Sequence, residues 1–406
     1  MKKNILFALL ANVVNAGVAW LLLLFLIRFG NNEDIGVYSL AQAIALPIHL
    51  FFTLKLRTIQ LSDVDGIYKN SDYFNSRVLL AVISFLFTII FSVILYKGEY
   101  SNILAISILG LGYSAILIRE YFISIYQINE RNEYFLYSNI VLGAASFISF
   151  VGAYLLSSDI IVAIISFSLI RVLSLIVDFI FLKRAFLDNV LLYIKDFNKV
   201  RILSVIKVGL PLGITAVIGS LFTSIPRIKL ENVAGLEVLG VFTTLMSLIA
   251  FFNLFMSSFS QALIPRLATI YRDSRRRLVK EVFLWLLVLI FGLSVCLVIT
   301  YYNASLILTL IFSEKYAQYS NEFFIAIVAG CILCVFHYSN MMLNIQRSFK
   351  SQVYIYSICV IVCLISSILL IPDMQLKGAI YTSIIGSLVG IIISLCVFTI
   401  NLRKLN

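Results

Sequence analysis

Long apolar runs separated by short polar segments fill the chain from end to end. Twelve of these runs approach or exceed the roughly 20 mostly apolar residues that a membrane-spanning helix needs. They are residues 5–27, 36–54, 78–96, 101–123, 136–156, 160–182, 205–226, 238–262, 282–302, 322–345, 352–371 and 378–400. Backbone groups in lipid must satisfy one another's hydrogen bonds, so we predict that all twelve are helices. The pattern predicts an all-α integral membrane protein.

The composition supports a membrane protein and leaves no room for a large soluble domain. Hydrophobic residues make up 61% of the 406 residues and charged residues only 13%. Soluble domains carry about 25% charged residues, so this chain has too little polar surface to cover its apolar side chains in water. No clear small-residue cleavage site follows the first run, 5–27, so we interpret it as a span and not as a signal peptide.

The Lys and Arg residues give the predicted spans an orientation. If the N-terminus lies in the cytoplasm, roughly four of every five of the 31 Lys and Arg residues fall in cytoplasmic segments, with Arg77 and Arg119 counted among them. This bias follows the positive-inside rule. It predicts a multi-pass protein with both termini in the cytoplasm. It also explains the net charge of +11 without a nucleic-acid partner.

A sequence repeat divides the chain into two halves. The longest predicted cytoplasmic connection, 183–204, separates an N-terminal six-helix bundle, 1–182, from a C-terminal six-helix bundle, 205–406. The segment Glu33–Ser39 opens the second predicted span, and the similar segment Glu237–Thr243 opens the eighth. An even number of spans per half gives both halves the same orientation, so we predict two pseudo-symmetric bundles.

No motif for catalysis, a cofactor or a metal ion stands out in the sequence. The six cysteines lie inside apolar runs, and the Cys331–Cys334 pair has no second pair and no histidine at ligand spacing. We interpret these cysteines as small hydrophobic residues. Paired carboxylates, a glycine-rich phosphate loop and a Ser/His/Asp pattern are also absent. We predict that the protein is not an enzyme and needs no cofactor.

Four short segments add to this arrangement of six plus six spans. They are Gly36–Ala41 at the start of the second span, Leu56–Gln60 at its end, Pro265–Arg266 at the end of the eighth, and Ile371–Ala379 before the twelfth. With them the chain resembles the polysaccharide-exporter branch of the multidrug/oligosaccharidyl-lipid/polysaccharide (MOP) exporter superfamily. This branch includes the Wzx-type flippases for O-antigen and capsule repeat units. The resemblance implies a MATE-like fold with a central cavity lined by spans one, two, seven and eight.

The resemblance also implies a function and its partners. The cargo would be an undecaprenyl-pyrophosphate-linked oligosaccharide, moved by alternating access from the inner to the outer leaflet of the bacterial cytoplasmic (inner) membrane during O-antigen, lipopolysaccharide or capsule biosynthesis. Membrane lipids, a polysaccharide polymerase and glycosyltransferases are the other implied partners. The acidic residue usual near the end of span seven is replaced here by Ile225–Arg227, so coupling to H+, to Na+ or to the membrane potential stays open.

Candidate binding residues follow from the chemistry of such a cargo. A pyrophosphate in a low-dielectric region needs fixed positive charge, and a sugar needs hydroxyl and amide partners. The candidate cavity cations are Arg28, Arg57, Arg171, Arg227, Lys229 and Arg266. The candidate sugar or proton contacts are His49, Asn15, Gln42 and Gln261. Arg171 lies near the middle of its span, where a charge costs roughly 2.5–3.5 kcal/mol.

Each assignment has a structural alternative. Arg171 could pair with Glu120 or Asp178 and only hold helices together, and the cations at span ends could be membrane anchors or solvated loop charges. A lone membrane histidine more often bonds to a neighbouring helix than carries protons. At the level of function, a multidrug or ion antiporter of the same fold would favour acidic and aromatic residues, and a polymerase or glycosyltransferase would need a large outer loop. The cationic excess and short outer loops favour the flippase.

Overall fold

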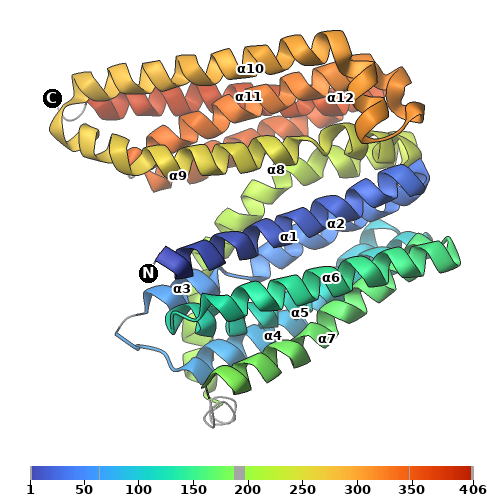
Figure 1. Ribbon diagram of the computed structural model, residues 1–406, viewed down its shortest axis with the longest axis vertical. Helices are drawn as coiled ribbons and strands as arrows, with labels where there is room; N and C mark the ends of the chain where they lie inside the picture. The colour runs from blue at the N-terminus through green and yellow to red at the C-terminus, as the bar shows by residue number, and fades with distance from the viewer. Residues whose placement is uncertain (1, 64, 187–196, 347, 404–406) are drawn as a thin grey trace. The chain divides into compact units, whose positions relative to one another are not determined.

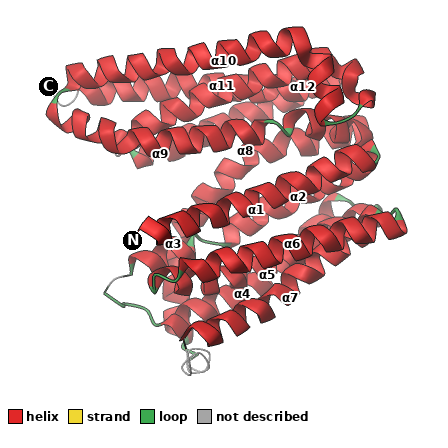
Figure 2. Ribbon diagram, in the orientation of Figure 1, coloured by secondary structure: helices red, strands yellow, loops and turns green. Residues whose placement is uncertain are grey.

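The computed structural model describes residues 2–63, 65–186, 197–346 and 348–403, and these residues form only helices and loops (Figures 1 and 2). The chain folds into two compact units, Met1–Ser220 and Leu221–Asn406. Residues 187–196 of the predicted linker lie outside the described residues. One helix, α8, begins in the first unit and continues into the second. The domain boundaries at 182 and 205 stay a prediction.

The first unit is a bundle of long helices around a core that is rich in aromatic residues. Its helices are α1 (Lys2–Phe29), α2 (Asn32–Phe52), α3 (Leu56–Ser62), α4 (Asn70–Leu95), α5 (Tyr100–Ile128), α6 (Asn132–Ser157), α7 (Ile160–Phe186) and the first part of α8 (Lys199–Met246). The side chain of Asn31 caps α2 by accepting a hydrogen bond of 2.7 Å from the Asp34 backbone N–H. Tyr126 and Phe135 are fully buried in the core.

The second unit contains the rest of α8, then α9 (Ile249–Asp273), α10 (Arg275–Ile311), the short 3-10 helix η2 (Glu314–Tyr319), α11 (Ser320–Ile345) and α12 (Phe349–Arg403). Three of its helices are interrupted by residues with non-helical backbone angles, and in α10 this residue is Asn303, with φ −125° and ψ 17°. The break in α8 lies at Gly235, with φ 80° and ψ 178°. The break in α12 lies at Gln375, with φ 44°. Glycine suits the break in α8 because it adopts positive φ at little cost.

Ten helical segments among the described residues are long and apolar enough to cross a membrane. Two of these, Lys199–Ser257 and Lys350–Leu402, have 59 and 53 residues, more than twice the length of one span, and contain the breaks at Gly235 and Gln375. The all-α membrane fold is therefore confirmed, while the number of twelve spans stays a prediction. The repeat falls at equivalent places, because Gly36 follows the start of α2 at Asn32 and Gly240 follows the break at Gly235.

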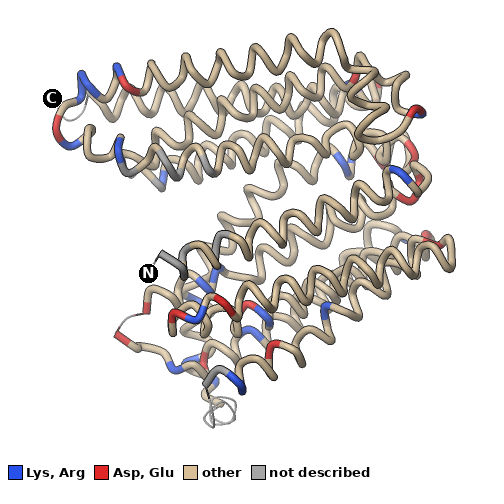
Figure 3. Tube along the Cα trace, viewed as in Figure 1, with Lys and Arg blue, Asp and Glu red and all other residues tan. Residues whose placement is uncertain are grey.

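The outward faces of the helices are apolar. Phe291 of α10 is 73% exposed, and large aliphatic and aromatic side chains are exposed along most of this helix. A continuous apolar surface of this kind is favourable in lipid and not in water. Charged residues of the first unit gather around α3 and the adjoining helix ends, and long stretches of helix carry none (Figure 3).

The break between α2 and α3 positions a residue of the candidate site. Leu54 and Lys55 have φ values of 45° and 47°, a left-handed conformation that is uncommon outside glycine. Two glycines of α8 pack against this break: a Cβ atom added at Gly213 would lie 2.6 Å from the Phe51 carbonyl oxygen. Because the backbone turns here, α3 starts in a new direction and carries Arg57 in its first turn.

Candidate functional site

A polar cavity lies inside the first unit. It has a volume of about 150 Å³ and is lined by side chains of α1, α2, α3, α5, α6 and α7. Its polar lining residues are Asn12, Asn15, Tyr38, Gln42, Arg57, Tyr113, Arg119, Glu120, Asn139, Ser146 and Arg171. Three arginines and one carboxylate in the lining give the cavity a positive balance of formal charge. Its amide and hydroxyl groups are the partners that sugar hydroxyls require.

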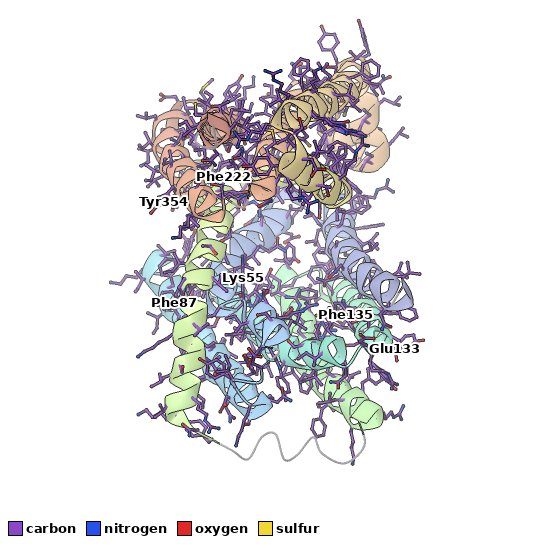
Figure 4. The ribbon with its side chains drawn as sticks, turned by 90° about the vertical axis from the view of Figure 1, so that its left-hand side faces the viewer. Lys55, Phe87, Glu133, Phe135, Phe222 and Tyr354 are labelled. Carbon is purple, nitrogen blue, oxygen red and sulfur yellow. The ribbon has the colours of Figure 1, made fainter. Side chains whose placement is uncertain are left out.

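Arg57 lines the cavity and takes part in both a hydrogen bond and an ion pair. Its Nε donates to the Gln127 side-chain oxygen at 2.9 Å, and its Nη1 lies 3.4 Å from a Glu120 carboxylate oxygen. The guanidinium carbon stands 5.0 Å from the centre of the Phe135 ring, which Figure 4 labels. About a quarter of each charged side chain is exposed. The long contact to Glu120 leaves Arg57 able to exchange this carboxylate for another anion.

The loop after α3 is held in place by one carboxylate, Asp63. Its oxygens accept hydrogen bonds from the backbone N–H groups of Ile67 and Tyr68 at 2.9 and 3.1 Å, and from the Tyr73 hydroxyl at 2.9 Å. Burial raises the pKa of Asp63, but these hydrogen bonds outweigh it and hold the pKa below its ordinary value. The loop ties α3 to α4 and so helps to fix Arg57.

Arg119 and Asp178 form a buried ion pair across α5 and α7. The Arg119 Nε lies 2.9 Å from Asp178 Oδ2, and the two side chains are only 5% and 1% exposed. Arg119 Nη2 also donates to Ser138 at 2.6 Å and to the Asn139 side-chain oxygen at 2.7 Å, while the Ser138 hydroxyl donates to Asp178. Asn139 in turn donates to the Ala11 carbonyl of α1 at 2.8 Å. The network joins four helices beside the cavity.

Arg171 reaches the cavity between aromatic rings and not beside a carboxylate. Its guanidinium stands 4.0 Å from the Phe167 ring centre and 5.1 Å from that of Tyr113. One of its buried atoms, Nη1, has no hydrogen-bond partner. The His49 ring stacks on the Tyr113 ring with ring centres 5.0 Å apart. The Nδ1 atom of His49 is also buried without a hydrogen-bond partner. The structural alternative for Arg171, a pair with Glu120 or Asp178, is wrong, because Arg57 pairs with Glu120 and Arg119 with Asp178.

Arg77 is a fully buried cation next to the cavity. It is 1% exposed and bonds through Nη2 to Gln60 at 3.2 Å and to Ser124 at 3.1 Å. Its Nε and Nη1 have no hydrogen-bond partner. Ser124 lies one helical turn after Glu120 and donates to its carbonyl at 2.7 Å. Arg77 therefore adds positive charge near the lining residues Arg57 and Glu120.

Arg77 and Arg119 correct our interpretation of the loop charges. We counted both as cytoplasmic anchors, but α4 begins at Asn70 and encloses Arg77, and Arg119 lies buried in α5. A buried cation that finds hydrogen-bond partners or a carboxylate does not end a span, so charge alone marks a helix end poorly. The signal that could have revealed Arg119 was Asp178, an acid within another predicted span.

The structure brings four of the predicted site residues together in the cavity of the first unit. Arg57, Arg171, Asn15 and Gln42 line the cavity, and His49 stacks on the lining residue Tyr113. Arg28 is exposed in the last turn of α1. Arg227 and Lys229 are half-buried on α8, in the second unit. Arg266 of α9 pairs with Glu281 at 3.2 Å. The Gln261 side chain lies outside the described residues.

Comparisons with known proteins point to one family. Residues 1–271 match the model of a family described as polysaccharide biosynthesis protein. The chain is 30% identical over 402 residues to the capsular polysaccharide biosynthesis protein CapF of Staphylococcus aureus, covering 97% of this chain and 98% of the relative.

Solved structures with the same fold include transporters of two kinds. The lipid II flippase MurJ in an inward closed conformation gives a TM-score of 0.73 at 13% identity, covering 97% of this chain and 87% of that one. An inward-facing multidrug resistance MATE family transporter of the MOP superfamily gives 0.70 at 12% identity, covering 98% and 96%. These likenesses show that the fold is MATE-like, as the sequence predicted.

Proposed function

Because this chain belongs to the polysaccharide biosynthesis protein family, we propose that it moves undecaprenyl-pyrophosphate-linked oligosaccharide repeat units from the inner to the outer leaflet of the bacterial cytoplasmic membrane. Alternating access of a MATE-like fold is the proposed means. The capsular relative suggests that the repeat units serve a surface polysaccharide such as a capsule. We expect no catalytic step on the sugar.

One observation carries the proposal: three arginines and a set of amides and hydroxyls line a single cavity in the first unit. A pyrophosphate is a doubly charged acceptor that arginine binds in a forked geometry. Of the two cavity arginines that pair with a carboxylate, Arg57 has the longer contact, at 3.4 Å from Glu120 against 2.9 Å for Arg119 and Asp178. In the proposal, a phosphate displaces Glu120 from Arg57. The positive charge of the nearby Arg77 then stabilises the Glu120 carboxylate in place of Arg57.

Another part of the cavity lining suits the sugar. Tyr113 and Phe167 offer ring faces, and the unpartnered Nη1 of Arg171 offers a donor. Gln42 and Asn15 add amide groups to the lining. We propose that these side chains meet the sugar next to the pyrophosphate. Arg28, Arg227, Lys229 and Arg266 remain proposed contacts for other stages of transport.

Three further parts of the proposal concern energy, place and partners. Coupling to a H+ or Na+ gradient, or to the membrane potential acting on the anionic head group, would drive transport. Both termini are proposed to be cytoplasmic, in line with the bias of Lys and Arg in the loops. A polymerase and glycosyltransferases would act on the same lipid-linked intermediate before and after this protein.

Replacing Arg57 tests the proposal. In cells that depend on this protein, we expect Arg57→Ala to abolish surface polysaccharide, because the pyrophosphate loses its first fixed cation. Lipid-linked repeat units should accumulate on the inner leaflet, which extraction and sugar analysis of the membrane lipids would measure. The matched control is Arg131→Ala, a more exposed arginine between α5 and α6 that is paired with Glu133 at 2.6 Å.

Normal polysaccharide in the Arg57→Ala strain, with the variant protein present in the membrane, would overturn the site assignment. Arg227→Ala is a second variant with the same expected result, from a different helix. If a strain lacking the protein keeps its polysaccharide and instead becomes sensitive to cationic drugs, a multidrug exporter is the better assignment.

A further inference from the structure

The three arginines that line the cavity of the first unit differ in their counter-ions. Arg57 lies 3.4 Å from a carboxylate oxygen of Glu120, and Arg119 lies 2.9 Å from one of Asp178. Arg171 pairs with no carboxylate among the residues that the structure describes, and its charge rests against aromatic rings instead. Because arginine stays charged inside proteins, the cavity has one cation that none of these side chains neutralises.

Aromatic rings hold the Arg171 guanidinium at the cavity without occupying all of its N–H groups. The guanidinium carbon lies 4.0 Å from the centre of the Phe167 ring and 5.1 Å from that of Tyr113. Ring faces attract a cation, so the side chain is held in place although it lacks a carboxylate. Its Nη1 is buried without a hydrogen-bond partner. A buried donor without a partner is unfavourable, so an acceptor on the cargo would stabilise this group.

Arg171 and Arg57 contact α5 at points about two turns apart. Arg171 lies over Tyr113. Arg57 lies beside Glu120. Tyr113 and Glu120 are seven residues apart, which is about 10 Å along the helix, and both line the cavity. A hydrogen bond is about 3 Å long, so one phosphate group bound to Arg57 does not also reach Arg171.

The lining near Arg171 carries groups that suit a sugar. Tyr38 lies close enough to interact electrostatically with Arg171. Gln42 follows Tyr38 by one turn of α2, and both line the cavity together with Asn15 of α1. Hydroxyl and amide groups of this kind bind sugar hydroxyls. A sugar that also carries a carboxylate would supply the anion that Arg171 lacks, in the forked geometry that arginine favours.

We propose that a sugar close to the pyrophosphate carries a carboxylate, as a uronic acid does, and that Arg171 binds this carboxylate. The inference rests on the proposed flippase function and names the class of repeat unit that its cavity selects. A neutral sugar leaves Arg171 buried without a counter-ion, so the same cavity binds it more weakly. Arg57 binds the phosphate that every such lipid carries, and Arg171 distinguishes acidic sugars from neutral ones.

Two lipid-linked probes that differ in one group test the proposal. They are undecaprenyl pyrophosphate carrying a single glucose and the same lipid carrying a single glucuronic acid. Binding of each probe to the purified full chain in nanodiscs would be measured. We expect the parent to bind the glucuronic acid probe roughly tenfold more tightly, the effect of one hydrogen-bonded charge pair. Arg171→Gln should lose this preference and bind the glucose probe as the parent does.

Two other arginines provide the controls. Arg131→Gln, at a more exposed arginine that pairs with Glu133, should leave the affinity for both probes unchanged. Arg57→Gln should weaken both probes by the same factor, because both contain the pyrophosphate. Unchanged binding of both probes to Arg57→Gln would count against the phosphate assignment of the proposed function, while a preference for the acidic probe would still support the carboxylate site.

Three binding results would overturn the carboxylate site. They are equal affinity of the parent for the two probes, an unchanged preference in Arg171→Gln, and equal weakening of both probes by Arg171→Gln, which would show that Arg171 binds the pyrophosphate.

A measurement in cells keeps the proposal testable if Arg171→Gln does not fold. The lipid-linked repeat units that accumulate in a strain lacking the protein should contain a carboxylate-bearing sugar, which mass spectrometry would detect. Repeat units made only of neutral sugars would overturn the proposal. If the parent prefers the acidic probe but cells without the protein keep their polysaccharide, the carboxylate site stands and the flippase assignment fails.

Discussion

At the scale of residues, the first unit carries its charges in two different environments. Arg119 and Asp178 neutralise each other in a buried, fully bonded pair, whereas Arg57, Arg77 and Arg171 keep contacts that are long, uncharged or incomplete. Removing one member of a buried pair leaves an uncompensated charge, which costs about 3–5 kcal/mol, while neutralising both is often tolerated. This difference separates residues that hold the bundle together from residues that can bind a ligand.

The Arg119–Asp178 pair gives a residue-scale prediction. Asp178→Asn alone should lower the melting temperature of the purified protein strongly, because Arg119 stays charged and buried. Adding Arg119→Gln should restore much of the lost stability, because the neutral pair can still form hydrogen bonds. Differential scanning fluorimetry in one detergent would compare the parent and the two variants. A double variant as unstable as the single one would show that the uncompensated charge of Arg119 is not the cause of the loss.

At the scale of elements, the break between α2 and α3 shows how one backbone feature places a functional side chain. Leu54 and Lys55 turn the chain, and α8 packs its glycines directly against the turn. Side chains at these glycine positions would overlap backbone atoms, so the close approach of the helices requires glycine. The apolar pattern predicted that a helix ends near residue 54, but it could not predict the left-handed turn that sets the direction of α3.

Replacing one of these glycines tests the packing. Gly213→Ala should destabilise the protein by about 1–3 kcal/mol, because its Cβ would lie 2.6 Å from the Phe51 carbonyl oxygen and force the helices apart. Gly152→Ala, at an open helical position, should leave stability unchanged or raise it by up to ~1 kcal/mol. Thermal melting of both variants gives the comparison. Equal stability of the two would mean that α8 does not depend on close packing at the break.

At the scale of the whole molecule, the chain is an all-α membrane protein of MATE-like fold made of two compact units. Its outward faces are apolar, and the charged ends of the predicted spans set its expected orientation. The orientation is the prediction that depends on every loop at once, because one missed or added span would reverse all later loops.

Cysteine labelling tests the orientation. With both termini cytoplasmic, the α6–α7 turn lies outside and the α9–α10 turn inside. Ser157→Cys should therefore react with a membrane-impermeant maleimide in intact cells, and Asp273→Cys only after the membrane is opened. Both positions are exposed, so access through the membrane decides the result. The parent chain, with its own six cysteines, supplies the background. If only the Asp273→Cys variant is labelled in intact cells, the orientation is the opposite of the predicted one.

The sequence by itself determined the class of the protein, its helices and its family resemblance. It could do so because apolar run length reports directly on the bilayer, and the starts of α2 and of the helix after Gly235 carry the repeated segments. It also named Arg57, Arg171, Asn15 and Gln42 as candidates, since a charge or amide inside or at the end of a span is conspicuous; all four line the cavity, and their role in binding stays a prediction.

Only the tertiary structure decided which of these residues meet. Arg119 was counted among the cytoplasmic cations, but in the structure Asp178 of α7 lies beside it and pairs with it. The sequence allowed Arg171 to pair with an acid, but in the structure its guanidinium lies over the rings of Tyr113 and Phe167. Arg266 was a candidate cavity cation, and the structure adds that it pairs with Glu281 of the next helix, while its part in transport stays a prediction. The physical reason is that a cation's role depends on which atoms surround it, and helices far apart in sequence supply those atoms.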